Sequence, residues 1–256
     1  DLSGSLDGHM SDAFTPTTLG GATVADVRNL GASVFTVAIG EQMRAPAERL
    51  REKCGVAYQV FDRLTGLAAN DALMRTLTEL SGRPVPQRLR RQRSQLQDAM
   101  LDAHFFLGGQ SFAIGAEPDL LYAVASMVAD LGGTVAAAVT TTKSPILERV
   151  PADEVVIGDL EDLETRAKDC AMLLTHAHGR QASQRLGIPL YRIGIPMFDR
   201  LGAAHRVSVG YRGTRDLVFD LANVLMAVEH GHKPTDWPLP PAALAAARGE
   251  PSIQPA

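Results

Sequence analysis

The segment from Ala171 to Arg200 constrains the fold most, because it holds two short apolar runs with a helical stretch between them. Ala171–Leu174 is too short for a helix and is typical of a strand buried in a parallel sheet. Gln181–Leu186 indicates a helix, ended by a glycine and a proline, and Leu190–Ile195 predicts the next strand. This order of strand, helix and strand favours a parallel α/β sheet.

Charged and imidazole side chains follow both of these predicted strands. His176, His178 and Arg180 come after the first strand, and Asp199 and Arg200 come after the second. Ligands of open α/β sheets bind at the carboxyl ends of the strands. We therefore expect these five residues to lie at a pocket or at a contact with a partner subunit, and they are the candidate site residues.

The two histidines leave several roles open. They could ligate a metal, transfer protons or donate hydrogen bonds to a partner subunit. No cysteine or carboxylate follows them at the spacing of a zinc site, so no metal ligand is predicted. The chain also lacks a glycine-rich dinucleotide fingerprint, a Walker A motif and a G-x-S-x-G motif, so no catalytic residue is predicted.

The turn Phe198-Asp199-Arg200 has two interpretations. Its Asp and Arg could form a catalytic ion pair, or the aromatic ring could pack while the charged groups hold the loop backbone. The same three residues occur as Phe61-Asp62-Arg63 after another predicted strand. A packing and tethering role would explain both occurrences without catalysis.

Strands and helices alternate along the chain, which predicts an α/β fold with helices on both faces of its sheets. We predict two Rossmann-like units, residues 1–107 and 108–256, because 256 residues can bury one large core or two moderate ones. The first unit would end with a long helix over Pro86–Leu107, whose arginines form either an anion patch or a solvated face. The last helix is predicted over Asp216–His230, followed by an extended tail rich in Pro and Ala after His232.

The charge and cysteine content exclude several classes of function. A net charge of −4 gives no reason to expect nucleic acid, and no apolar run is long enough for a membrane span. The first ten residues have neither a basic start nor an apolar run, so we expect no signal peptide there. The two cysteines, Cys54 and Cys170, form no C-x-x-C motif, which fits a reducing cytoplasm better than an oxidising compartment.

Several blocks, in order along the chain, resemble the β-type subunits of the nitrogenase component 1 family. Each block is weakly specific, and the ordered set is strongly specific. The blocks are Gly20-Gly21-Ala22-Thr23, Gln95–Ala103, Phe112–Asp119, Leu173–Arg180, Arg192–Arg200 and Gly210-Tyr211-Arg212-Gly213. Within the family, the start DLSGSLDGHM and the motif THAHGR resemble most the β-type subunit of the scaffold on which the iron–molybdenum cofactor is completed.

The resemblance implies Rossmann-like domains packed against a homologous α-type partner in an α2β2 assembly. It also implies that the complex holds iron–sulfur clusters and the cofactor precursor, and that a transient iron protein supplies electrons. In this family the cluster cysteines come from N-terminal domains and the α-type partner holds the precursor. Cys54 and Cys170 lie outside the matching blocks, so we expect this chain to bind no cofactor by itself.

Two other classes stay open at this point. The first is a catalytic β subunit of a nitrogenase or a related reductase, which should supply several cysteines to a shared cluster. The second is a two-domain module that binds a small molecule, since such receptors also use two Rossmann-like units.

Overall fold

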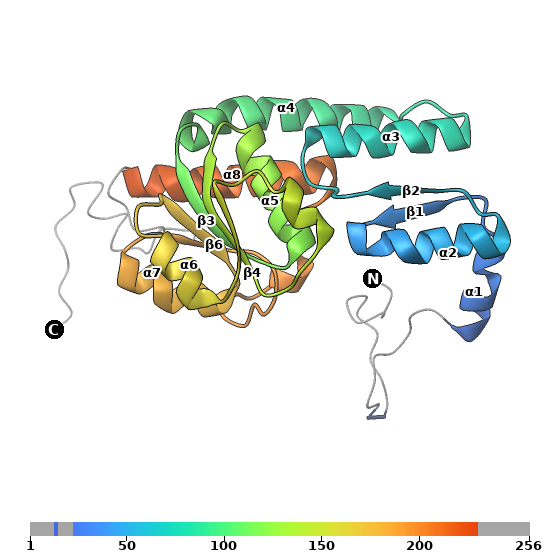
Figure 1. Ribbon diagram of the computed structural model, residues 1–256. Helices are drawn as coiled ribbons and strands as arrows, with labels where there is room; N and C mark the ends of the chain where they lie inside the picture. The colour runs from blue at the N-terminus through green and yellow to red at the C-terminus, as the bar shows by residue number, and fades with distance from the viewer. Residues whose placement is uncertain (1–12, 15–22, 230–256) are drawn as a thin grey trace.

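The computed structural model describes residues 13–14 and 23–229, which form two parallel sheets flanked by helices (Figure 1). The first sheet pairs β1 (Thr36–Ile39) with β2 (Tyr58–Phe61). The second sheet has five parallel strands: β3 (Ser111–Gly115), β4 (Thr134–Thr140), β5 (Glu154–Ile157), β6 (Met172–Thr175) and β7 (Leu190–Arg192).

Eight α-helices and several short 3₁₀ turns connect these strands in the described part of the chain. The helices are α1 (Val24–Asn29), α2 (Arg44–Cys54), α3 (Leu67–Ser81), α4 (Gln87–Leu107), α5 (Pro118–Asp130), α6 (Leu160–Arg166), α7 (Arg180–Leu186) and α8 (Gly210–Glu229). The turns that matter below are η2 (Glu41–Met43), η3 (Pro145–Arg149) and η4 (Ala177–Gly179).

The five-stranded sheet forms the main core because its central strands are buried on both faces. Phe112 and Ile114 of β3 point toward α4, α5 and α8, in one hydrophobic cluster with buried residues of those helices. Ala113 of β3 and Leu173 of β6 point the other way, toward α6 and α7. Helices therefore cover both faces of this sheet, as the alternating sequence pattern predicts.

The two units meet through polar and aromatic contacts around Tyr122 of α5. The guanidinium groups of Arg63, after β2, and Arg149, at the end of η3, each lie 5.1 Å from the centre of the Tyr122 ring. Both arginines also donate hydrogen bonds to the Tyr122 hydroxyl, at 3.0 and 3.1 Å. Arg149 forms an ion pair of 2.6 Å with Asp62 of the first unit.

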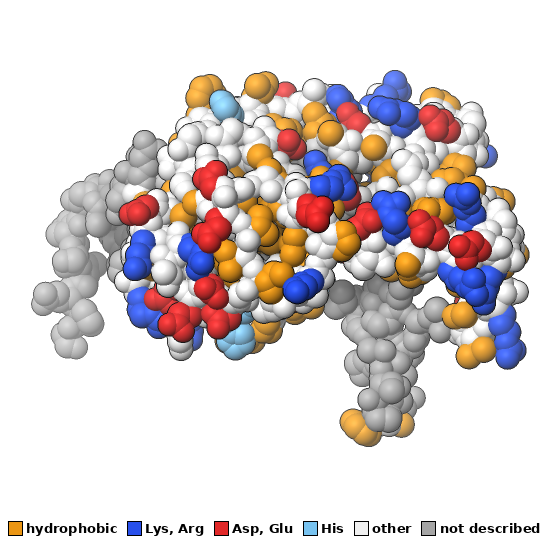
Figure 2. Space-filling view, in the orientation of Figure 1, with side chains coloured by type: hydrophobic (Ala, Val, Ile, Leu, Met, Phe, Trp, Pro, Cys, Tyr) orange, Lys and Arg blue, Asp and Glu red, His pale blue; other side chains and the backbone are white. Residues whose placement is uncertain are grey.

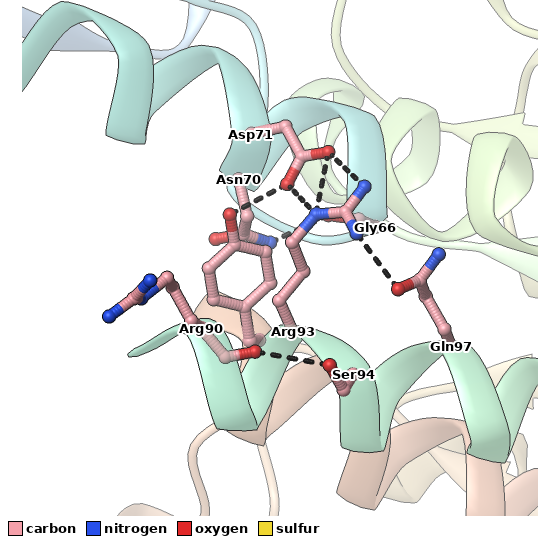
Figure 3. A network of polar contacts seen from close by, with 8 residues as sticks. Gly66, Asn70, Asp71, Arg90, Arg93, Ser94 and Gln97 are labelled. Carbon is pink, nitrogen blue, oxygen red and sulfur yellow. Dashed lines mark hydrogen bonds and ion pairs between the residues drawn. The ribbon is translucent and has the colours of Figure 1, made fainter. Parts of the chain in front are cut away.

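A second polar network joins α3, α4 and α8 (Figure 3). Asp71 of α3 accepts two hydrogen bonds from Nε of Arg93 on α4, at 2.9 and 3.1 Å, and one from Nη2 at 2.8 Å. The Tyr211 hydroxyl on α8 donates to Asp71 at 2.7 Å. Burial alone would raise the pKa of Asp71, but the hydrogen bonds from Arg93 and Tyr211 outweigh it and lower that pKa below its usual range.

The last helix begins at Gly210, earlier than the predicted start at Asp216. The sequence did not predict helix before Asp216, because two glycines, Gly210 and Gly213, lie in the first turn. Gly213 is needed there because a Cβ atom at this position would lie 2.7 Å from the carbonyl oxygen of Val207. Strand β7 is also shorter than predicted: it ends at Arg192, and Gly194 has a positive φ of 69° that interrupts an extended strand.

The prediction of a mixed α/β fold with parallel sheets flanked by helices is confirmed. The division at residues 107 and 108 stays a prediction. The N-terminal segment DLSGSLDGHM, most of the block at Gly20–Thr23 and the tail after His232 lie outside the described residues. Among the helices that the structure describes, none combines the length and apolar character required to cross a membrane.

We expect Tyr211→Phe to destabilise the protein by about 1–3 kcal/mol, because it removes a hydrogen bond to a charged, partly buried carboxylate. Urea unfolding followed by circular dichroism would measure the change. Tyr58→Phe is the matched control, since the Tyr58 hydroxyl donates to Glu48 on the surface at 3.1 Å, and it should change stability by less than about 0.5 kcal/mol. Equal effects of the two variants would contradict the role of the Asp71 network.

Candidate functional site

The candidate residues lie where the strands of the five-stranded sheet end. The strand order is β5-β4-β3-β6-β7, so the chain leaves β3 toward one edge and β6 toward the other. Ligand sites of open α/β sheets form at such a reversal, outside the carboxyl ends of the strands. In Figure 1 the orange segment of the chain lies at this lower edge of the sheet. The turn after β6 is next to the loop after β7, because the N–H of Ala177 donates a hydrogen bond to the carbonyl oxygen of Pro196 at 3.0 Å.

The structure brings His176 and His178 together directly after β6. His176 accepts a hydrogen bond through Nδ1 from the backbone N–H of His178 at 3.3 Å, and so caps the short turn η4. The two imidazole rings have their centres 5.5 Å apart, at 85° to one another. Because Nδ1 of His176 accepts, the proton of the neutral ring is placed on Nε2.

The close turn after β6 depends on Gly179. A Cβ atom at this position would clash with the methyl group of Thr175, the last residue of β6. The motif THAHGR therefore folds as one unit: the strand ends at Thr175, His176 caps the turn, and Arg180 begins α7.

Burial lowers the pKa of His176 below its ordinary range, and the neighbouring His178 lowers it further, whereas Glu117 acts in the opposite direction. The folded state thus favours the neutral imidazole. Stability from this group is complete above a pH of about 6.5, and it declines as the pH falls through the lowered pKa, because the unfolded chain binds the proton more readily.

Asp199 is held inside its own loop by Arg192, the last residue of β7. The guanidinium group of Arg192 donates to both carboxylate oxygens of Asp199, at 2.7 to 2.9 Å. Only 11% of the Arg192 side chain and 14% of the Asp199 side chain are exposed. These hydrogen bonds lower the pKa of Asp199 below its usual range, so this carboxyl group is ionised at neutral pH.

Arg192 was missed by sequence reasoning because it lies within the predicted strand and looked like part of it. The repeated Phe-Asp-Arg residues gave a usable signal, since Asp62 of the first copy also binds an arginine of a distant segment, Arg149. In both copies the aspartate joins two pieces of chain. Tethering is therefore the role that this geometry supports for Asp199.

Arg180 and Arg200 are exposed at the same edge of the sheet. Phe198, which precedes Asp199, packs edge-on against His178 with ring centres 5.1 Å apart. The loop after β7 therefore contacts the turn after β6 through this aromatic pair. Within the residues that the structure describes, no hydrogen bond or ion pair joins Arg180 to either histidine.

A groove of about 550 Å³ between α6 and α7 extends to His178. It is lined by charged and polar side chains, among them Glu164, Lys168, Gln181 and Arg185. The ion pair between Arg185 and Glu164, at 2.5 Å, joins its two walls. This groove is an open surface feature between helices and not an enclosed pocket.

The described residues contain no group of three or more His, Cys, Asp or Glu side chains that could hold a metal ion. The two cysteines lie in different units, Cys54 exposed at the end of α2 and Cys170 buried just before β6. Burial raises the pKa of the Cys170 thiol.

Comparison with known proteins identifies the family. Residues 6–226 match the family model described as nitrogenase component 1 type oxidoreductase, so the chain belongs to the nitrogenase component 1 family. The protein named nitrogenase iron-molybdenum cofactor biosynthesis protein NifN from Bradyrhizobium diazoefficiens is 57% identical over 89% of this chain. The protein of the same name from Klebsiella pneumoniae is 39% identical over 90% of this chain.

A solved structure titled "Nitrogenase Cp1 at pH 6.5" superimposes with a TM-score of 0.80 and 27% identity, covering 94% of this chain and 56% of that chain. The chain spans about half the length of the curated relatives it matches, 49% of the Bradyrhizobium protein and 50% of the Klebsiella protein.

We expect His178→Gln to raise the pKa of His176, because it removes the imidazole that lowers it. The pKa should stay below its ordinary value of about 6.5, since burial remains. A histidine titration followed by NMR would measure both rings. An unchanged His176 pKa in the variant would show that the two rings are not coupled.

Proposed function

We propose that this protein acts as a β-type scaffold subunit in the biosynthesis of the nitrogenase iron–molybdenum cofactor. The observation that carries the proposal is the high identity to proteins named NifN over about nine-tenths of this chain. The motif at the carboxyl end of β6 and the loop after β7 belong to the matched region, which supports a shared use of this edge.

The partner we propose is a homologous α-type subunit of the NifE kind, in an α2β2 complex located in the cytoplasm. The complex would take an iron–sulfur precursor as its substrate, convert it to mature cofactor and receive electrons from a transient iron protein. In this scheme the precursor is cargo passed through the assembly.

The residues described do not fit an iron–sulfur cluster. Such clusters are held by several cysteine thiolates, and the cysteines of this chain are far apart in the fold, in different units. We therefore propose that clusters in the complex are anchored by other polypeptide. The role left to this chain is to shape the assembly and contact its partner.

His176, His178, Arg180, Asp199 and Arg200 have separate parts in this proposal. His176 is neutral and positioned by its bond to the His178 backbone, so its Nε2–H is available as a donor. Asp199 keeps the loop after β7 in place through Arg192. His178, Arg180 and Arg200 are exposed at the edge and would contact the partner subunit.

A catalytic nitrogenase β subunit is the second candidate, because the matched solved structure is a nitrogenase. The two functions differ in what the intact complex does. A catalytic subunit supports substrate reduction in a complex that already holds mature cofactor, whereas a scaffold subunit supports maturation and transfer of the cofactor to a separate apoenzyme.

We expect the double variant His176→Gln, His178→Gln to bind the α-type partner about tenfold more weakly, with a matching loss of cofactor maturation. Affinity purification with the partner and reactivation of apo-nitrogenase are the two measurements. His104→Gln is the control, since His104 bonds the Leu131 carbonyl at the opposite end of the sheet. Unchanged binding and unchanged maturation would remove both histidines from the partner contact.

A further inference from the structure

The loop after β7 exposes several large apolar side chains. Ile195 is 87% exposed, Phe198 is 63% exposed and Leu201 is fully exposed. Val207 and Val209, near the end of the same loop, are also exposed. Single exposed apolar residues are ordinary on a protein surface, but several large ones within one loop indicate a contact surface. Figure 2 shows a histidine beside hydrophobic side chains at this lower edge of the molecule.

The loop is fixed before any partner binds. The pair Arg192–Asp199 joins its two sides, and the carbonyl oxygen of Pro196 accepts a hydrogen bond from the N–H of Ala177 at 3.0 Å. Phe198 is also held against the ring of His178. A surface that needs no ordering on binding loses less conformational entropy, so its apolar side chains can contribute fully to affinity.

The chain around this loop is rich in arginine, although the whole protein carries a net charge of −4. Between His176 and Arg215 the sequence has seven arginines, three histidines and a single carboxylate, Asp199. Four of these arginines are already paired within the fold: Arg185 with Glu164, Arg192 with Asp199, Arg206 with Asp220 and Arg215 with Asp216. Arg180 and Arg212 are exposed and form no ion pair among the described residues. Asp220 on the adjacent face of α8 is also engaged, by the Tyr191 hydroxyl at 2.7 Å and by Arg206.

We propose that Ile195, Phe198 and Leu201 insert into an apolar recess with an acidic rim on the α-type partner subunit, with the exposed Arg180 and Arg212 paired to that rim. The inference depends on the function proposed above and specifies the partner's surface at the same site. The net charge of −4 weighs against a polyanion such as nucleic acid as the partner. A second copy meeting through this same surface would place like charges opposite each other, which opposes association.

The experiment measures binding of the chain to purified α-type partner for Phe198→Ser and Leu201→Ser. Each change should weaken binding by at least about tenfold, as for a central apolar anchor. Phe105→Ser is the matched control, because Phe105 is 83% exposed on α4, away from the loop, and it should leave the affinity unchanged. Thermal unfolding of all three variants checks that the fold is intact.

The salt dependence of binding tests whether the partner's recess has an acidic rim. Binding by the unaltered chain should weaken as salt is added, and Arg180→Glu should slow association and reduce this salt dependence. Salt-independent binding would overturn the acidic rim. Binding of the unaltered chain to vesicles of anionic phospholipid, lost in the Phe198→Ser variant, would assign the surface to a membrane and overturn the inference.

The outcomes separate the inference from the proposed function. If the unaltered chain binds the partner and both loop variants bind equally well, the inference fails and the scaffold role stands. If the unaltered chain neither binds the partner nor supports cofactor maturation, the proposed function itself fails.

Discussion

Burial of β3 and β6 on both faces is the constraint on which the rest of the structure depends. All four residues of β6 are buried, and Phe112, Ala113 and Ile114 of β3 are inaccessible to solvent. Strands covered by helices on both sides cannot carry charged side chains along their length, because an unpaired buried charge is too costly. Polar chemistry is therefore restricted to the strand ends, and that is where the histidines and the paired Arg192 and Asp199 lie.

Much of the fold could be predicted because local patterns and long-range packing agree. The apolar run before Thr175 correctly predicts strand β6, and the glycine after Leu186 correctly predicts the end of α7. Both features depend only on neighbours in sequence. The start of α8 could not be predicted. Its Gly213 is required by the approach of the Val207 carbonyl, a contact that sequence periodicity does not contain.

The candidate site was predictable in position but not in detail. The rule that strand ends carry function located His176, His178 and the turn at Asp199 in one region. The partner of Asp199 could not be read from the sequence, because Arg192 meets it only after the loop folds back onto the strand end. The contact between His178 and Phe198 likewise joins two segments whose proximity follows from the order β3-β6-β7.

The polar contacts between the two units differ in how strongly salt weakens them. Ion pairs at a surface lose strength in salt, and Arg149–Asp62 is such a pair, with half of the arginine exposed. The two guanidinium groups over Tyr122 also make direct contact with an aromatic ring and its hydroxyl, and dispersion in such close packing is not screened by ions. The contact of Arg63 and Arg149 with Tyr122 is therefore expected to weaken less with rising ionic strength than the Arg149–Asp62 ion pair alone.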